Sequence, residues 1–202
     1  MSSKIRKSTT GFTLVELLVS VAIVVLIMSV VLFNYTGFND NLALASGGQE
    51  LAIAIRQAQT YGLTVKEVTP GGGRFDSAYG IYFDPSSSPS AYYIFADINS
   101  NKTYDAGSGC GSGNTECVGR FDLRNGVKIS GICDQNACPP EVSVKMMDIT
   151  FLRPNPDAGI YFTNNGGQIK VGPSLTGKVV LTSPKGKTLT VRIESTGQVL
   201  VQ

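Results

Sequence analysis

The sequence predicts an α+β protein in which a long N-terminal helix, membrane-spanning in its first half, packs on an antiparallel β-sheet domain. Residues 12–33 form an apolar run, and residues 44–65 carry an apolar stripe with helical spacing. Strand-like segments separated by turn residues follow from Pro70. A chain of 202 residues accommodates the membrane segment and one domain of ordinary size, so we expect no second large domain.

The apolar run from Phe12 to Phe33 is long enough to cross a bilayer. It contains 22 residues, which as a helix span about 33 Å. Lys4, Arg6 and Lys7 precede it, and the positive-inside rule therefore places the N-terminus in the cytoplasm. Everything after Phe33 is predicted to lie on the other side of the cytoplasmic membrane, outside the cytoplasm.

Glu16 is the exception within this run. A carboxylate in the hydrocarbon region costs several kcal/mol and needs a cationic partner, which no nearby residue of the helix supplies. A removable secretory signal would have its small-residue cleavage site after the run, whereas Gly11 lies before it. Cleavage between Gly11 and Phe12 would create an α-amino group able to pair with Glu16, in the same chain or in a neighbouring copy.

The segment that surrounds this junction resembles a known export signal. Residues 7–19, with the sequence KSTTGFTLVELLV, are similar to the class III signal of type IV pilins and type II secretion pseudopilins. The resemblance implies that a prepilin peptidase cuts after Gly11 and N-methylates Phe12. It also implies that Glu16 aligns an incoming subunit with the N-terminus of its neighbour.

The same resemblance predicts a pilin-like architecture and a location. The expected parts are a leader (1–11), a transmembrane helix (12–33), an amphipathic helix (34–68) and a β-rich domain (69–202). The implied partners are other pilin or pseudopilin subunits, the prepilin peptidase and an assembly platform in the inner membrane, and no cofactor is implied. The domain would be periplasmic or extracellular.

The helix is expected to continue beyond the membrane. Residues 34–41 are poor helix formers and allow a kink there. The segment from Ser46 to Gln49 is interpreted either as a capping box that opens a new helix or as a soft point within one long helix. The apolar stripe that should pack on a sheet consists of Leu44, Leu51, Ile55, Ala58, Gly62 and Val65.

Eight segments have the composition of strands: 79–83, 91–96, 142–146, 149–152, 159–162, 178–182, 188–193 and 197–201. Residues 183–187 should join two of them as a hairpin. The segments 51–65 and 191–199 and the strand before Asp97 are similar to H-type minor pseudopilins and FimT-like minor pilins. This implies a minor structural subunit of a type II secretion pseudopilus or a type IV pilus.

DNA uptake and catalysis are the alternative functions. Residues 34–202 hold 17 − 3 = 14 basic and 15 − 1 = 14 acidic residues, so charge gives no general reason to bind DNA. FimT-like proteins that bind DNA use basic residues near the C-terminal strand, where this chain has Gln198. The chain has no histidine, which excludes Ser-His-Asp triads and histidine-ligated metals. We therefore expect no enzyme, with a membrane-anchored exported hydrolase as the remaining catalytic alternative.

Four cysteines lie in the exported part, where an oxidising compartment favours disulfides. Of the three possible pairings we favour Cys110 with Cys117 and Cys133 with Cys138, because short loops in Gly-rich sequence close easily, although crossed pairing stays open. Zinc is the less favoured alternative, since the spacing from Cys110 to Cys117 is too wide for a usual zinc knuckle.

A polar segment after the second predicted strand has two interpretations. Oxygen-bearing side chains alternate in it as at the start of an EF-hand calcium loop: Asp97, Asn99, Asn101, Thr103 and Asp105. It departs from that loop because Lys102 replaces the invariant glycine and Ser108 replaces the closing glutamate, so calcium would need a further ligand such as Glu116. The favoured interpretation is a turn whose side chains bond the local backbone.

Overall fold

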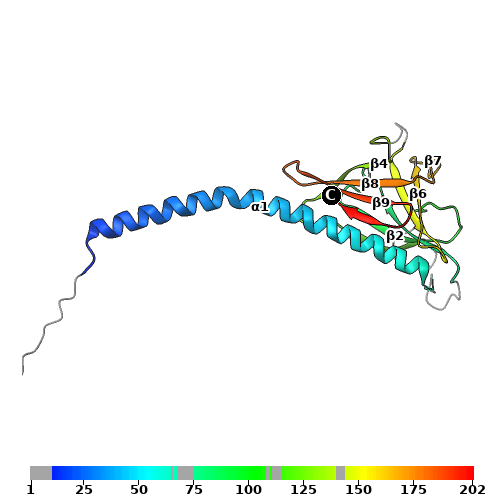
Figure 1. The fold of residues 1–202 in the computed structure, drawn as a ribbon, viewed down its shortest axis with the longest axis horizontal. Coiled ribbons are helices and arrows are strands. Elements are labelled where there is room, and N and C mark those ends of the chain that lie inside the picture. Colours follow the sequence, from blue (N-terminus) through cyan, green and yellow to red (C-terminus); the bar gives the residue numbers. More distant parts are fainter. Residues whose placement is uncertain (1–10, 65, 68–74, 108–109, 111–114, 140–143) are drawn as a thin grey trace, which may run out of the picture. The chain divides into compact units, whose positions relative to one another are not determined.

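The computed structural model describes residues 11–64, 66–67, 75–107, 110, 115–139 and 144–202. Within these residues the chain forms one helix, α1 (Leu14–Leu63), followed by ten strands. It divides into two compact units, residues 1–39 and residues 40–202 (Figure 1). The first contains the beginning of α1, and the second contains the rest of α1 and every described strand. The predicted α+β class is confirmed.

The strands form two antiparallel sheets. The six-stranded sheet has the order β3-β2-β1-β5-β6-β7, and the four-stranded sheet has the order β10-β9-β8-β4. The bounds of the first sheet are β1 (Ala78–Phe83), β2 (Ala91–Asp97), β3 (Cys117–Asp122), β5 (Met146–Phe151), β6 (Ala158–Thr163) and β7 (Ile169–Val171). Those of the second are β4 (Lys128–Cys133), β8 (Thr176–Thr182), β9 (Thr188–Glu194) and β10 (Val199–Val201).

Most of the expected strands are present, with three additions and one fusion. The sequence did not predict β3, β4 or β7, because the first two contain glycine and charged or polar residues and the third has only three residues. The expected strand 142–146 is wrong in its described part, since 144–145 are not strand and Met146 begins β5. Asp148 made β5 look like two segments, but it is completely buried in the middle of one strand.

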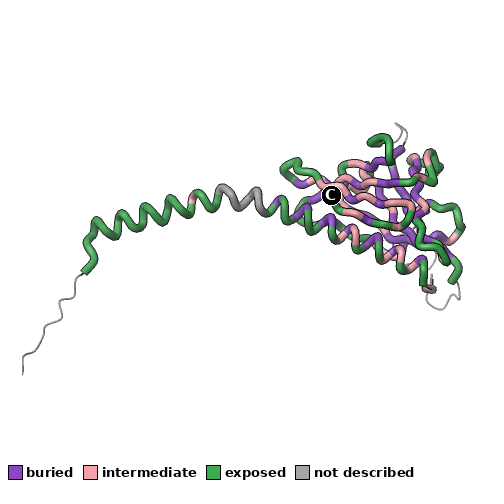
Figure 2. Tube along the Cα trace, in the orientation of Figure 1, coloured by how far each residue is buried: buried purple, intermediate pink, exposed green. Residues whose placement is uncertain are grey.

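The apolar stripe of α1 forms the helical side of the core, as predicted. Leu44, Leu51, Ile55 and Ala58 are all nearly or completely buried, and Gly62 is buried with them, whereas Val65 lies outside the described residues. Figure 2 shows the buried positions gathered on one side of this part of α1 and along the strands. The core thus joins α1 to inward-facing side chains from both sheets.

The helix runs without a break through residues 34–41 and through Ser46 to Gln49. The capping-box interpretation of Ser46 is therefore wrong, and the alternative of one long helix holds. Gly47 and Gly48 lie where α1 approaches the four-stranded sheet, and a Cβ built on Gly48 would lie 2.7 Å from Leu189 Cδ2. Gly48 therefore permits close packing of the helix on the sheet, and α1 ends at Leu63.

Candidate functional site

The start of α1 holds the residues of the predicted processing and assembly site. Gly11 and Phe12 are exposed and precede the helix, and Phe12 is 79% exposed. No heavy atom lies within 4 Å of the position a Cβ would take on Gly11. The peptide bond between them is therefore sterically open to a peptidase. Lys4, Arg6 and Lys7 lie outside the described residues.

Glu16 lies in the first turn of α1. Its backbone N–H donates to Thr13 Oγ1 at 3.2 Å, so Thr13 is the N-cap of the helix and Glu16 occupies the third helical position. A negative charge at this end is favoured by the helix dipole. This N-cap was not predicted from the sequence, although a threonine directly before an apolar run is a usual signal for one.

The N-cap does not provide a cation for the carboxylate. No lysine or arginine occurs between Phe12 and Ile55, so a cationic partner from within α1 is excluded over more than ten turns. An ion pair with Glu16 therefore needs a cation from outside this part of the chain, such as one that precedes the helix or one that belongs to another molecule. Cleavage after Gly11 would supply such a cation, since the new α-amino group of Phe12 could pair with Glu16 of the same chain or of a neighbouring copy.

The following stretch of α1, Leu14–Leu32, is the one helical segment among the described residues with the length and composition to cross a membrane. It has 19 residues and a mean hydropathy of 2.9, and none of it is buried by the rest of the protein. Its two serines bond the helix itself, since Ser20 Oγ donates to Glu16 O and Ser29 Oγ donates to Leu26 O. The polar groups of these serines are thus satisfied within the helix, as hydrocarbon surroundings require.

The structure pairs the four cysteines as Cys110–Cys117 and Cys133–Cys138, which are the favoured local pairs. The disulfide Cys110–Cys117 links the preceding loop to the first residue of β3, and Cys133–Cys138 links the last residue of β4 to the turn that follows it. With all four sulfurs in disulfides, no thiolate set for zinc is formed.

The side chains of the calcium candidate segment bond the local backbone. Asp97 accepts from the N–H groups of Asn101 and Lys102 at 3.1 and 3.0 Å, and Asn101 Oδ1 accepts from Thr103 N–H at 2.9 Å. Asp105 Oδ2 accepts from the side-chain amides of Asn99 and Asn101 at 2.6 and 2.8 Å. These contacts are those of an Asx-rich turn. Ser108 lies outside the described residues.

Two buried carboxylates attach this turn to the first sheet. The sequence linked Glu116 to this segment only as a possible calcium ligand, and Asp148 was not linked to it. Glu116 accepts from the N–H groups of Ile98 and Asp105, both at 2.9 Å, and Asp148 accepts from Tyr104 N–H at 2.9 Å. Asp148 also accepts from the Thr163 hydroxyl at 3.2 Å. Among the described residues, no group of three or more acidic, cysteine or histidine side chains has an arrangement suited to a metal ion.

Burial changes the acidity of these anchors. It raises the pKa of Asp148 to about 7, and it also raises the pKa of Glu116 and of Asp97. Each carboxylate nevertheless accepts backbone N–H groups, which favour its charged form. The three acids therefore serve the structure of residues 97–105 in the described geometry.

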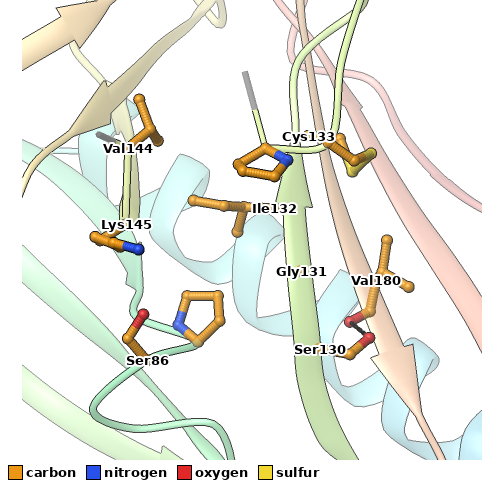
Figure 3. Close-up of a pocket in the computed structure, with 11 residues that line it drawn as sticks. Ser86, Ser130, Gly131, Ile132, Cys133, Val144, Lys145 and Val180 are labelled. Carbon is orange, nitrogen blue, oxygen red and sulfur yellow. Dashed lines mark hydrogen bonds between the residues drawn. A yellow bond between two sulfur atoms is a disulfide. The ribbon is translucent and has the colours of Figure 1, made fainter. Parts of the chain in front are cut away.

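A pocket of about 360 Å³ lies beside β4, between the disulfide Cys133–Cys138 and the segment at Val144 and Lys145 (Figure 3). Its one ionisable side chain is that of Lys145. The nearby Ser130 hydroxyl donates to Val180 O and accepts from the Thr182 hydroxyl. The pocket thus lacks a pair of titratable groups with opposed roles, the arrangement that acid–base catalysis uses.

The comparison with known families bears on the N-terminal site. Residues 6–32 match the family model for the prokaryotic N-terminal methylation motif. The match includes the Gly11–Phe12 junction, Glu16 and the apolar helix up to Leu32. It supports a processed subunit of the type IV pilin and pseudopilin type, anchored by a single membrane pass. No curated protein and no solved structure matches the chain.

Proposed function

We propose that this chain is a minor structural subunit of a type II secretion pseudopilus or a type IV pilus. The observation that supports this most is the combination at the start of α1: an open Gly11–Phe12 bond inside a methylation motif, followed by Glu16 in an exposed apolar helix. The motif accounts for processing, and the helix accounts for both membrane anchoring and assembly.

Before assembly, the apolar segment holds the subunit in the cytoplasmic membrane. The basic residues ahead of it keep the N-terminus in the cytoplasm, and the strand-rich unit lies on the opposite side, where its two disulfides are stable. Prepilin peptidase cuts after Gly11 and methylates Phe12. The inner-membrane assembly platform then moves the processed subunit into a filament.

Assembly replaces lipid around Leu14–Leu32 with the helices of neighbouring subunits. This exchange has little hydrophobic driving force, because lipid tails are as apolar as the helix. Close packing and a specific polar contact must therefore select the filament arrangement. Glu16 provides that contact by pairing with the N-terminal amine of an adjacent subunit, and no cofactor is needed.

The test is the distribution of the chain between membranes and filaments. In cells that produce prepilin peptidase, filaments sheared from the surface or purified after overproduction of the system should contain the chain. In cells without the peptidase, the chain should stay in the inner membrane with its leader attached. Recovery only from the membrane in both strains would refute the subunit role.

One observation favours DNA binding as a second candidate. The outward face of the four-stranded sheet carries Lys128, Lys178 and Arg192, since their strand neighbours Ile129, Val179 and Val191 are buried. Lys178 is directly opposite Arg192 in the β8–β9 ladder. One acid on this face, Glu194, contacts Arg192 at 2.6 Å. The strands thus concentrate basic residues that a neutral overall charge conceals.

A mobility-shift experiment with the detergent-solubilised chain distinguishes this candidate. If the face binds DNA, the shift should weaken with salt, and Lys178→Ala should reduce it while Lys170→Ala, on the other sheet, should not. Absence of a shift at low salt would remove DNA binding as a function.

A further inference from the structure

The free edge of the six-stranded sheet has the features of a pairing surface. β3 is the terminal strand of this sheet, and within the described part of the chain no strand lies on its outer side. Its last three residues are exposed: the side chains of Arg120 and Asp122 are 52% and 63% exposed, and Phe121 as a whole residue is 38% exposed. Open strand edges present backbone groups that pair readily with another strand.

The ladder with β2 shows which backbone groups are directed outward. Leu123 N–H donates to Ser90 O at 2.8 Å, and hydrogen-bonded pairs alternate along an antiparallel ladder. Phe121, paired with Tyr92, is therefore hydrogen-bonded to β2. Arg120 and Asp122 fall at the intervening positions, so their N–H and C=O groups point away from β2 toward the free edge.

A hollow of about 540 Å³ adjoins this edge, between β3 and α1. Its lining combines apolar side chains, among them Phe121, Tyr92 and Ile53, with polar and charged ones such as Glu50 and Arg124. The ring of Phe121 stacks on that of Tyr92 with centroids 5.6 Å apart. Ile53 is 65% exposed although it belongs to the part of α1 that packs on the sheets. An added strand would cover Phe121 and place its own inward side chain at this hollow.

The edge is complementary to itself. If a second copy of β3 pairs antiparallel with Phe121 opposite Phe121, then Arg120 of each copy lies opposite Asp122 of the other. In this register both charged residues use their outward backbone groups, so the hydrogen-bonding pattern and the charge pattern agree. The two Phe121 side chains meet at the hollows beside the helices.

The cost of rearranging the charges is small. Within one chain Arg120 and Asp122 contact each other at 2.9 Å, on the face of the sheet opposite to Phe121. Exposed ion pairs of this kind contribute little to stability, so exchanging partners between copies is nearly neutral. The gain comes from backbone hydrogen bonds and from covering the exposed side chains of Phe121 and Ile53.

We propose that two copies of this chain pair through their β3 edges, with Phe121 at the two-fold axis and two reciprocal Arg120–Asp122 pairs. Such a contact is isologous and closes on itself, unlike the head-to-tail contacts that build filaments. It describes a pair of membrane-anchored subunits. The pairing does not depend on cleavage after Gly11 or on the proposed filament role.

Oxidative cross-linking of the full chain in membranes tests the pairing. Because the backbone groups of Phe121 point toward β2, the two Phe121 residues form a non-hydrogen-bonded pair in the ladder between copies. Residues opposite each other at such a position lie close enough for a disulfide, so Phe121→Cys should form a covalent dimer of twice the chain mass. Ile169→Cys on β7, the other edge of the same sheet, is the matched control and should not. Phe121→Cys in a Gly11→Val background should cross-link equally, which separates this outcome from failure of processing.

Charge reversal then identifies the register. Arg120→Asp in the Phe121→Cys chain opposes two carboxylates across each pair and should lower dimer yield about ten-fold. The combined exchange, Arg120→Asp with Asp122→Arg, restores opposite charges and should recover the yield. Both side chains are exposed, and an unchanged thermal unfolding curve verifies the fold of each variant.

Three outcomes would overturn the proposal. These are no homodimer, a dimer indifferent to both charge variants, or a cross-linked product whose mass shows a different protein at the edge. The last would assign β3 to an extended segment of another partner.

Discussion

Thr13 caps the helix in which Glu16 lies, with the Glu16 N–H donating to Thr13 Oγ1 at 3.2 Å. Because the contact uses the backbone N–H of Glu16, the position of this residue and the charge of its side chain can be tested separately. Its position in the first turn helps to start the helix, and its charge is available to a cation outside α1. If Glu16 served only to start the helix, any residue that preserves the N-cap contact could replace it.

The Glu16→Gln variant isolates the charge. The amide keeps the size of the side chain, and the capping contact uses the Glu16 backbone N–H, so cleavage and membrane insertion should proceed normally. Incorporation into filaments should nevertheless fall at least about ten-fold, because an ion pair in apolar surroundings is lost. Quantitative immunoblotting of membrane and filament fractions measures both steps.

Thr13→Ala is the control for the capping role. It should weaken the first turn by about 1 kcal/mol yet leave the charge of Glu16, and filaments should still incorporate it. Normal incorporation of Glu16→Gln together with a loss in Thr13→Ala would show that the capped first turn, and not the charge of Glu16, is required, and the pairing role would be lost.

Substitution by alanine should have opposite effects on stability at two glycines of α1. A Cβ on Gly62 would collide with the backbone carbonyl of Phe151, whereas one on Gly47 would meet no atom closer than 3.5 Å. Gly62→Ala should therefore destabilise the domain by about 1–3 kcal/mol, because the helix must move off the sheet. Gly47→Ala should stabilise it by up to about 1 kcal/mol through helix propensity.

Urea unfolding of the detergent-solubilised chain, monitored by the circular dichroism of its tyrosines, measures the free energy of unfolding of both variants. Equal effects of the two substitutions would show that α1 does not approach β5 as closely as described.

Asp148 should make stability depend on pH. Its pKa is about 7 in the folded chain against an ordinary value of 3.8, so between these values the folded state binds more protons than the unfolded state. The free energy of unfolding should therefore fall as pH rises from about 4 to about 7, by at most about 4 kcal/mol from this group.

Asp148→Asn should flatten that dependence. The amide can accept from Tyr104 N–H and donate to the Thr163 hydroxyl without a buried charge, so the variant should gain stability mainly at pH 8. Asp157→Asn, at an exposed position, serves as the control. An unchanged slope between pH 5 and pH 8 in Asp148→Asn would contradict the assigned role of burial.

The sequence was most informative where one feature dominated the local structure. The apolar run, the stripe from Leu44 to Gly62 and the β-branched strands are periodic, so their elements could be predicted. β3 could not, since Arg120 and Asp122 lower its strand propensity and only pairing with β2 reveals it. The glycines within α1 were equally ambiguous. A glycine that weakens a helix and a glycine that allows close contact with a sheet cannot be told apart from the sequence.

The candidate site divides along the same line. Gly11, Phe12 and Glu16 are neighbours in sequence, and their chemistry could be predicted from spacing alone. The anchoring of residues 97–105 could not: Glu116 was linked to the segment only as a calcium ligand, and Asp148 is far away in sequence and meets the turn only through the sheet. Long-range pairing of polar groups has no local signal.

Mass spectrometry of the N-terminal peptide from native, filament-associated protein decides whether Glu16 has its proposed cationic partner. The mature chain should begin at Phe12 with a methylated α-amino group, which places a cation within reach of Glu16 in the assembled state. Functional protein that retains residues 1–11 would contradict it.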